Sequence, residues 1–226
     1  EMATACADAL AAARARGITT FCDLNYRGKL WTPEKAQRTM RGLLPMVDVC
    51  IANDEDAPSA LGMTCVSGSL TSGIEERDSY AEMAHQICSE YGCRAVASVV
   101  RDVQCVERSQ WMGVLYDAAS DSHWSSCAHD VHVLEGVGAG LLRTVGVHDV
   151  DLDVRVLEHG THVVAGDAFN AGLIHAWLHG FEPQQAIDYA IAASILKLTI
   201  RGDQNLVTSE EIAAVAAKGA GSRVER

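Results

Sequence analysis

Asp167 is the residue of this sequence best placed to do chemistry. It stands in a run of small residues, Val163-Val164-Ala165-Gly166-Asp167-Ala168-Phe169-Asn170-Ala171-Gly172-Leu173, which we expect to open into a helix starting at Asp167. Free backbone N–H groups at a helix start, together with the helix dipole, bind anions such as phosphate. An aspartate beside such a site can accept the proton of a hydroxyl that attacks a phosphoryl group. The alternative is that Asp167 only caps the helix, a position that aspartate favours.

Two polar loops follow predicted strands and offer further ligand groups. Asp23–Arg27 follows the strand Ile18–Cys22, and Asn53–Asp56 follows the strand Val47–Ala52. Parallel α/β sheets place ligand-binding groups in loops at the carboxyl ends of their strands. An arginine in the first loop can clamp a carboxylate or phosphate, and oxygens in the second can hold Mg²⁺, usually through water. Taken with Asp167, these loops favour a phosphoryl-transfer pocket over three unrelated solvated loops.

The elements that must position these residues alternate between helix and strand, which predicts an α/β fold. The predicted helices are Met2–Arg16, Pro33–Leu44, Asp54–Leu61, Arg77–Glu90, Asp167–His179, Pro183–Thr199 and Ser209–Lys218. The predicted strands are Ile18–Cys22, Val47–Ala52, Arg94–Val100, Trp111–Tyr116 and His129–Leu134, of which the last two are antiparallel. Thr32 is expected to cap the second helix, with Pro33 in its first turn. No low-complexity linker divides the chain, so we expect one domain.

The composition excludes several classes of protein. With 18 Lys+Arg against 30 Asp+Glu, the chain has a net charge of −12, which argues against nucleic-acid or membrane-surface binding. The most apolar stretch, Ala186–Ile200, is too short and too interrupted by charge to span a bilayer. Eight cysteines without a C-x-x-C pair, and no secretion signal, indicate reduced thiols in a cytoplasmic protein. The densest group of zinc-type ligands matches no common zinc spacing and consists of His123, Cys127, His129 and His132.

The motifs of this chain resemble those of the ribokinase-like (PfkB) carbohydrate kinases, and among them the 2-keto-3-deoxygluconate kinases. The resemblance runs from end to end and is carried by Phe21–Trp31, Asn53–Asp56, Val100–Asp102, Ala165–Gly172 and Leu196–Asn205. The first and last of these segments are specific to the ketodeoxygluconate branch. The resemblance implies a three-layer α/β/α fold with a mostly parallel central sheet. It also implies ATP- and Mg²⁺-dependent phosphorylation of the terminal hydroxyl of a sugar acid, with 2-keto-3-deoxygluconate as the expected substrate.

Catalytic and substrate-binding roles follow from the same resemblance. Asp167 would be the catalytic base, and the backbone of Ala165 and Gly166 would form the anion hole for the transferring γ-phosphate. Arg27 would reach the sugar acid, with Asn25 in the same substrate-binding loop. The expected partners are therefore a small-molecule sugar acid and ATP.

Metal and nucleotide positions are implied in the same way. Asn53 and Asp56 match the N-x-x-E motif that organises Mg²⁺ and phosphate, although Asp56 is one methylene shorter than the glutamate of the family. Arg101, Ser109 and Asn205 would border the nucleotide.

The chain departs from the family pattern at two points. It begins at a helix that would be internal to the family fold, so we expect the N-terminal part with the lid and most sugar contacts to be missing. In the motif D-x-x-G-x-G-D, Val164 replaces the first glycine, while a closer match upstream ends at Gly140. We therefore predict a 26-residue insertion at 140–165, or a misread gene segment, that splits the anion-hole loop. The functionally neutral interpretation of Leu141–Val164 is a solvated surface excursion. Val-Leu-Glu also recurs, at 133–135 and 156–158.

Two alternatives to a ketodeoxygluconate kinase remain open on the sequence. A fructokinase- or ribokinase-type sugar kinase shares the family motifs, but the loop with Arg27 weighs against it, since an acidic substrate requires that arginine. A catalytically inactive remnant is favoured by both departures from the family pattern. The sequence leaves homo-oligomerisation open.

Overall fold

The computed structural model describes residues 1–63, 74, 77–105, 108–133, 154–156, 161–200 and 204–218. The chain forms two compact units. The N-terminal unit comprises Glu1–Val100 and Val114–Trp124, and the C-terminal unit comprises Arg101–Gly113 and Ser125–Arg226. The expectation of one kinase domain with an insertion at 140–165 stays a prediction.

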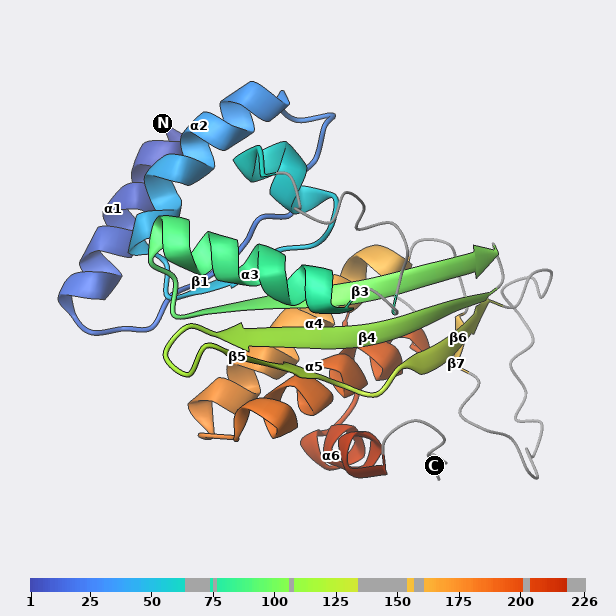
Figure 1. Ribbon diagram of the computed structural model, residues 1–226. Coiled ribbons are helices and arrows are strands. Elements are labelled where there is room, and N and C mark those ends of the chain that lie inside the picture. The colour runs from blue at the N-terminus through green and yellow to red at the C-terminus, as the bar shows by residue number, and fades with distance from the viewer. Residues whose placement is uncertain are drawn as a thin grey trace, which may run out of the picture. The chain divides into compact units, whose positions relative to one another are not determined.

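Seven strands pair within the described residues, in the order β1-β2-β3-β4-β6-β7 with β5 beside β4 (Figure 1). Their bounds are Phe21–Asp23 (β1), Val49–Ile51 (β2), Ala95–Cys105 (β3), Arg108–Asp117 (β4), Ser122–Ser125 (β5), His129–Val133 (β6) and Val154–Val156 (β7). β1, β2 and β3 are parallel, with Cys22 opposite Cys50 and Cys50 opposite Val96. β4 and β6 are antiparallel, as predicted, and β6 and β7 are parallel. Parallel strands linked through helices confirm the predicted α/β class.

The three long helices of the N-terminal unit begin where the sequence places them, whereas the short helix predicted to begin at Asp54 begins at Ala57. The long helices are α1 (Met2–Ala15), α2 (Pro33–Leu43) and α3 (Arg77–Tyr91), with the short turns η1 (Leu44–Met46) and η2 (Ala57–Leu61). The predicted start of α2 is confirmed, because Thr32 accepts the N–H of Lys35 at 3.4 Å and Pro33 stands in the first turn. Gly17 follows α1 with a φ of +65°, a left-handed conformation that glycine adopts without steric cost.

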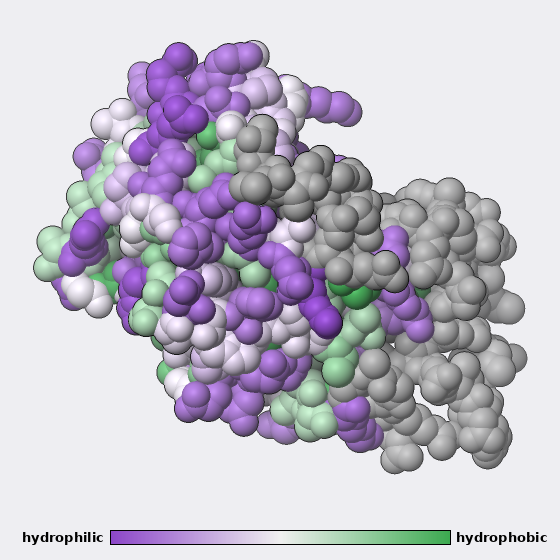
Figure 2. Space-filling view, viewed as in Figure 1, coloured by the Kyte–Doolittle hydropathy of each residue, from purple (hydrophilic) through white to green (hydrophobic). Residues whose placement is uncertain are grey.

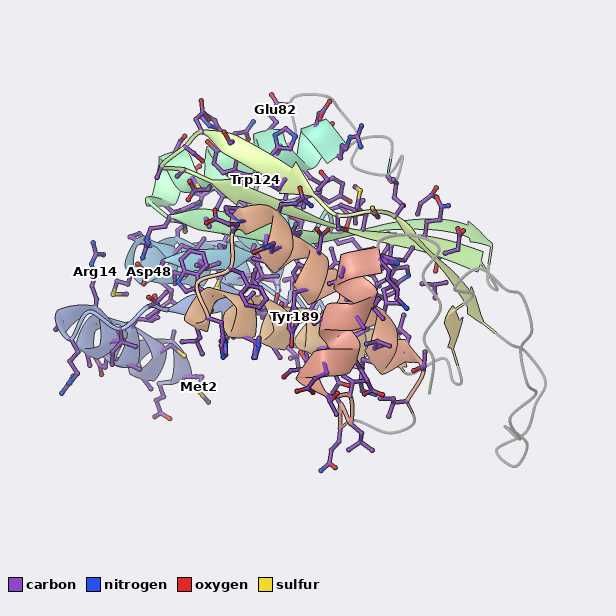
Figure 3. All side chains as sticks on the ribbon, turned by 90° about the horizontal axis from the view of Figure 1, so that it is seen from below. Met2, Arg14, Asp48, Glu82, Trp124 and Tyr189 are labelled. Carbon is purple, nitrogen blue, oxygen red and sulfur yellow. The ribbon has the colours of Figure 1, made fainter. Side chains whose placement is uncertain are left out.

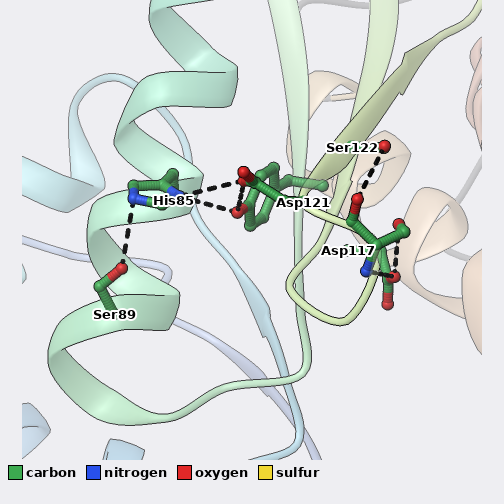
Figure 4. A network of polar contacts seen from close by, with 7 residues as sticks. His85, Ser89, Asp117, Asp121 and Ser122 are labelled. Carbon is green, nitrogen blue, oxygen red and sulfur yellow. Dashed lines mark hydrogen bonds and ion pairs between the residues drawn. The ribbon is translucent and has the colours of Figure 1, made fainter.

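A polar network ties the turn between β4 and β5 to α3 (Figure 4). The hydroxyl of Tyr116 donates to Oδ1 of Asp121 at 2.7 Å and lies 2.8 Å from Nδ1 of His85. Asp121 has a φ of +48°, which aspartate tolerates better than most residues. Burial, reinforced by Asp121, raises the pKa of Tyr116 to about 12. The phenol therefore stays protonated at neutral pH and can keep donating to the turn.

The described part of the C-terminal unit contains the helices α4 (Thr161–Leu178), α5 (Pro183–Leu198) and α6 (Ser209–Lys218). α4 and α5 approach closely at Gly172, where a Cβ atom would lie 3.0 Å from both Cα of Ala190 and Cβ of Ala193. Tyr189 of α5, labelled in Figure 3, stacks on His175 of α4 with ring centroids 5.0 Å apart. Because residue 172 is a glycine without a Cβ atom, the backbones of α4 and α5 can pack closely against each other there.

α4 starts earlier than the sequence predicts. The predicted helix began at Asp167, but Thr161–Gly166 already belong to α4, so that prediction is wrong. Val164 stands where the family motif has a glycine, and it lacks the freedom of glycine to turn the backbone. Residue 165 is alanine, which has the highest helix propensity of all residue types, and this also favours continuation of the helix. Ala165 and Gly166 consequently lie inside the helix and not at its free end.

Part of the segment interpreted as a solvated excursion is regular structure. β7 lies within that segment, and its parallel register with β6 places Val133 opposite Val156. These two valines are the first residues of the two copies of Val-Leu-Glu. Residues 154–156 and 161–164 are thus regular structure, and the interpretation of 140–165 as an insertion stays a prediction. Residues 134–153 and 157–160, which include the glycine-rich match ending at Gly140, lie outside the described residues.

No helix in the described ranges is long and apolar enough to cross a membrane. In the face of the molecule seen in Figure 2, hydrophilic residues cover most of the described surface, and apolar residues occur between them in small areas. Apolar residues scattered in this way are normal on a folded protein and mark no interaction surface by themselves.

Candidate functional site

Two loops that carry predicted site residues leave the same edge of the sheet. The Asn25 loop (Leu24–Gly28) follows β1, and the Asn53 loop (Ala52–Asp56) follows β2. β1 and β2 are parallel neighbours, so their carboxyl ends lie side by side. The N–H of Leu24 also donates to the carbonyl of Ile51 at 3.0 Å, which holds the two loops together at their start. The structure thus brings the predicted substrate loop and the predicted metal loop together.

The Asn25 loop has a tightly defined backbone. Asn25 has a φ of +38°, and its N–H donates to Oδ1 of Asp23 at 3.0 Å. The hydroxyl of Tyr26 donates to the carbonyl of Trp31 at 3.1 Å. Arg27 is exposed, and its guanidinium donates to the carbonyl of Tyr26 at 3.0 Å. The loop therefore holds an exposed cation next to the carboxyl ends of β1 and β2.

Asn53 and Asp56 are engaged with each other and with the backbone. Oδ1 of Asp56 accepts the N–H of Tyr26 at 2.8 Å, and Oδ2 accepts Nδ2 of Asn53 at 3.3 Å. Oδ1 of Asn53 in turn accepts the N–H of Val99 at 3.1 Å. Burial raises the pKa of Asp56 above its usual range, although the hydrogen bonds from Tyr26 and Asn53 and the charge of Arg27 act in the opposite direction.

These contacts decide whether the pair fits a metal ion. Asp56 is only 7% exposed, and each of its oxygens already accepts a hydrogen bond from the protein. Mg²⁺ is usually held by one or two carboxylate oxygens, with waters and substrate phosphates completing a nearly octahedral set, so a ligand carboxylate must be open to the ion and its waters. In this arrangement the side chains of Asn53 and Asp56 do not fit Mg²⁺ as direct ligands. Their metal role stays a prediction from the resemblance.

Asp167 lies in the C-terminal unit, on an exposed position of α4. The carbonyl of the buried Ala165 accepts a hydrogen bond from the hydroxyl of Ser194 at 2.9 Å. The N–H groups of Ala165 and Gly166 come after the first four residues of α4, and an α-helix leaves only its first four N–H groups without internal partners. The predicted anion hole is therefore not at a free helix end. The role of Asp167 as a base stays a prediction.

Two of the predicted nucleotide neighbours meet at Trp111. The guanidinium of Arg101 lies 5.3 Å from the centroid of the Trp111 ring, within the range of a cation–π contact. The indole N–H of Trp111 donates to Oγ of Ser109 at 3.0 Å. Trp111 is 2% exposed, so its ring is a packing surface for Arg101 and not a platform for a base. Asn205, the third predicted neighbour, lies in the loop before α6, where its Oδ1 accepts the N–H of Val207 at 3.4 Å.

Sequence reasoning missed the partners that hold these groups. Tyr26 and Val99 act through their backbone N–H groups, and no residue type reveals such a role. Trp111 could have been found, because residues two apart on a strand share a face and Ser109 had already been singled out.

The described part of the chain contains no cluster of three or more His, Cys, Asp or Glu side chains arranged to hold a metal ion. Its cysteines are free thiols. Burial raises the pKa of Cys22 to about 11 and those of Cys88 and Cys93 to about 12, so these thiols stay protonated and unreactive at neutral pH.

Comparison with solved structures defines the class of the fold. Nearly the whole chain superimposes on ribokinase-like carbohydrate kinases, which confirms the predicted three-layer α/β/α class. No protein-family model matches the chain.

Two of the particular relatives are named as kinases of 2-dehydro-3-deoxy sugar acids. The crystal structure of 2-dehydro-3-deoxygluconokinase from Thermotoga maritima is 31% identical, with a TM-score of 0.74, over 93% of this chain and 53% of that one. A PfkB family carbohydrate kinase from Listeria grayi is 25% identical, with a TM-score of 0.71, over 95% of this chain and 55% of that one. The curated 2-dehydro-3-deoxygalactonokinase of Haloferax volcanii is 22% identical over 87% of this chain and 46% of its own length. The chain thus spans about half the length of these relatives, and its resemblance to the ketodeoxygluconate branch is confirmed.

Proposed function

We propose that the protein to which these residues belong transfers the γ-phosphoryl group of ATP to the terminal hydroxyl of a 2-keto-3-deoxy sugar acid, most simply 2-keto-3-deoxygluconate. The observation that carries the proposal is the likeness to the Thermotoga maritima 2-dehydro-3-deoxygluconokinase over 93% of this chain. The Phe21–Trp31 segment, typical of the same branch, supports it. An enzyme of this class is expected to act where its thiols stay reduced, in the cytoplasm.

Arg27 is the proposed partner of the substrate carboxylate. Its side chain is exposed beside the ends of β1 and β2, and the hydrogen bond to Tyr26 limits its freedom. A guanidinium can bind a carboxylate through two parallel hydrogen bonds, which a neutral sugar does not offer. This preference for an acid supports a sugar-acid kinase over a fructokinase or ribokinase. Asn25, exposed in the same loop, is the proposed partner of a substrate hydroxyl.

Asp167 is the proposed base. In the transfer step the terminal hydroxyl oxygen forms a bond to the γ-phosphorus, and the bond from that phosphorus to the β,γ-bridging oxygen breaks, which releases ADP. The hydroxyl proton moves to the carboxylate of Asp167. The amides of Ala165 and Gly166 can take part only if the first turns of α4 open, because those amides are now within the helix.

ATP is the proposed phosphoryl donor, and Mg²⁺ is proposed to accompany it by balancing the phosphate charge. Arg101, held against Trp111, is a proposed contact for the nucleotide phosphates, with Ser109 beside it and Asn205 toward the adenine. Asn53 and Asp56 are not proposed as direct ligands of Mg²⁺, because their oxygens accept hydrogen bonds from the protein.

The test is steady-state phosphorylation of 2-keto-3-deoxygluconate, its galactonate epimer, fructose and ribose, with Arg27→Gln beside the parent. Loss of a charge-assisted hydrogen-bond pair is expected to raise the sugar-acid KM by about 10-fold to 100-fold. Lys29→Gln, which removes an exposed cation two residues away, is the matched control and should leave that KM within about twofold. Turnover of fructose that is insensitive to Arg27→Gln would contradict the proposal.

A catalytically inactive remnant is the second candidate, and the helical conformation of Thr161–Gly166 favours it, because it removes the amides from the expected anion hole. The same assay separates the two. An inactive remnant turns over none of the four substrates and is equally inactive with Asp167→Asn.

A further inference from the structure

Hydrogen bonds of Asn53 and Asp56 join the segments that follow β1 and β2 to the middle of β3. The N–H of Tyr26, just after β1, donates to Asp56, the amide of Asn53, after β2, donates to the same carboxylate, and the N–H of Val99 in β3 donates to Asn53. These bonds measure 2.8, 3.3 and 3.1 Å. We call this set of two side chains and two backbone N–H groups the Asp56 brace. It lies entirely within the N-terminal unit.

The brace satisfies a carboxylate that the fold has buried. Asp56 is 7% exposed, and a buried carboxylate is costly unless its oxygens accept hydrogen bonds. Each oxygen of Asp56 has one N–H donor, and neither donor is a cation. The shorter side chain of aspartate, compared with the glutamate of the family motif, keeps both oxygens close to the backbone. The carboxylate is therefore part of the scaffold.

The Asn25 loop depends on such a contact. Asn25 has a φ of +38°, a left-handed conformation that asparagine adopts more readily than most residues but that surrounding contacts still help to hold. Asp23 holds the N–H of Asn25 from one side, and Asp56 holds the N–H of Tyr26 from the other. Arg27 follows directly, and its guanidinium is hydrogen bonded to the carbonyl of Tyr26. The position of Tyr26 thus sets the direction of Arg27.

We propose that Asp56 is a positioning residue, which holds the Asn25 loop so that Arg27 faces the carboxylate of the substrate, and that it is not a ligand of Mg²⁺. The proposal rests on the proposed function, in which Arg27 binds a sugar acid. Loss of the brace should therefore weaken binding of the sugar acid and leave the KM for ATP and the Mg²⁺ requirement unchanged.

Exchanging the carboxylate and the amide between positions 53 and 56 distinguishes a positioning role of Asp56 from a role in metal binding. In Asp56→Asn, Oδ1 can still accept the N–H of Tyr26, but the new amide N–H₂ faces the amide N–H₂ of Asn53, so the link between positions 53 and 56 is lost. In the double variant Asn53→Asp with Asp56→Asn, the amide of residue 56 donates to the carboxylate of residue 53. Residue 53 still accepts from Val99, and residue 56 still accepts from Tyr26. Every hydrogen bond of the brace is then restored, while the carboxylate has moved.

The first measurement is amide hydrogen exchange at Tyr26 and Val99 in the parent, Asp56→Asn, the double variant and the control Glu55→Gln, which neutralises the exposed neighbouring acid. In Asp56→Asn the side chain of residue 56 is no longer held by Asn53, so its hydrogen bond to the N–H of Tyr26 opens more often. We therefore expect Asp56→Asn to speed exchange at Tyr26 by about tenfold or more, and the double variant to restore protection. Unchanged protection in Asp56→Asn overturns the brace. Loss of protection in both variants also overturns the brace. Protection would then require a carboxylate at position 56, and the restored hydrogen bonds of the double variant would not be sufficient. Circular dichroism confirms that each variant is folded.

The second measurement is calorimetric binding of 2-keto-3-deoxygluconate to the same four proteins, with and without Mg²⁺. We expect weaker binding in Asp56→Asn, recovery in the double variant, and equal effects at both Mg²⁺ levels. A deficit confined to Mg²⁺-containing buffer, and not recovered in the double variant, supports metal binding and overturns the proposal. If the parent binds no sugar acid, the proposed function fails, and the exchange measurement still decides whether the brace exists.

Discussion

The Asn25 and Asn53 loops and the start of α4 carry motifs of the same kinase family, but only the loops adopt the arrangement that their sequence predicts. Both loops leave neighbouring parallel strands, and Tyr26 contacts Asp56 directly at 2.8 Å. In α4 the motif Ala165–Gly172 is intact in sequence, yet Thr161–Gly166 continue the helix across the expected turn.

The difference teaches what each kind of site depends on. A site at strand ends is fixed by the sheet, because pairing with β2 and β3 determines where the loops begin. A site at a helix start depends on a few backbone dihedral angles, and one glycine decides them. Val164 stands in place of that glycine, and in this structure α4 begins three residues before it, at Thr161.

The largest predicted effect is a gain of activity when residues 140–165 are deleted, which joins Ala139 to Gly166 and rebuilds a V-G-A-G-D sequence. Amides freed at the new helix start should raise kcat/KM for the sugar acid by about 10²-fold to 10³-fold, as for a restored oxyanion donor. The measurement is the steady-state rate of ADP release.

Two controls belong to this deletion. Deleting only 141–153 shortens the segment but keeps β7 and the start of α4, and should not raise the rate. Asp167→Asn in the 140–165 deletion should lower kcat by about 10²-fold to 10⁴-fold, the usual contribution of a general base. Equal activity in the two deletions would show that the helical conformation of Thr161–Gly166 is not what limits catalysis.

The contrast between the loops and α4 also shows which features of the structure can be predicted from the sequence. The start of α2 was predictable because Thr32 and Pro33 determine it locally, and the class of the fold followed from the alternation of helices and strands. The Asp56 brace was not predictable, because every residue except proline carries the same backbone N–H group and the sequence does not distinguish those of Tyr26 and Val99. β7 was missed because Val154–Val156 is short and gains its stability only by pairing with β6.

The next largest effect should come from Gly172→Ala, which probes packing in α4 away from the motif turn. The new Cβ would lie 3.0 Å from Cα of Ala190 and Cβ of Ala193, and one of these is a backbone atom that cannot rotate away. Overpacking of this kind costs about 1–3 kcal/mol of unfolding free energy. Chemical denaturation followed by circular dichroism measures it. A variant as stable as the parent would mean that α4 and α5 are further apart than described.

Gly166→Ala is the matched substitution in the same helix and should have a smaller effect of opposite sign. Beyond the neighbouring backbone of α4, no atom of the described residues lies within 4 Å of its added Cβ, so no described contact opposes the better helix propensity of alanine. If Gly166 is inside α4, the variant gains about 0.5–1 kcal/mol of stability. A loss of stability in the same denaturation experiment would place Gly166 in a turn, and the contrast between α4 and the two loops would disappear.

The smallest effect is expected from pH, and it should differ between the two units. Burial lowers the pKa of His129 in the C-terminal unit, while the charge of Asp130 acts in the opposite direction. The folded state therefore favours the neutral imidazole, so the stabilisation is complete above the ordinary histidine pKa of about 6.5 and is lost as pH falls below it. The contribution of Asp56 in the N-terminal unit depends on pH in the opposite direction, because its raised pKa favours the folded state at low pH and this contribution is lost as pH rises.

Amide exchange between pH 7.5 and 5.5 should show protection falling in β6 relative to β2. His129→Gln should remove that difference and His123→Gln should keep it. A fall of equal size in both units would assign the acid sensitivity to the fold as a whole and not to His129.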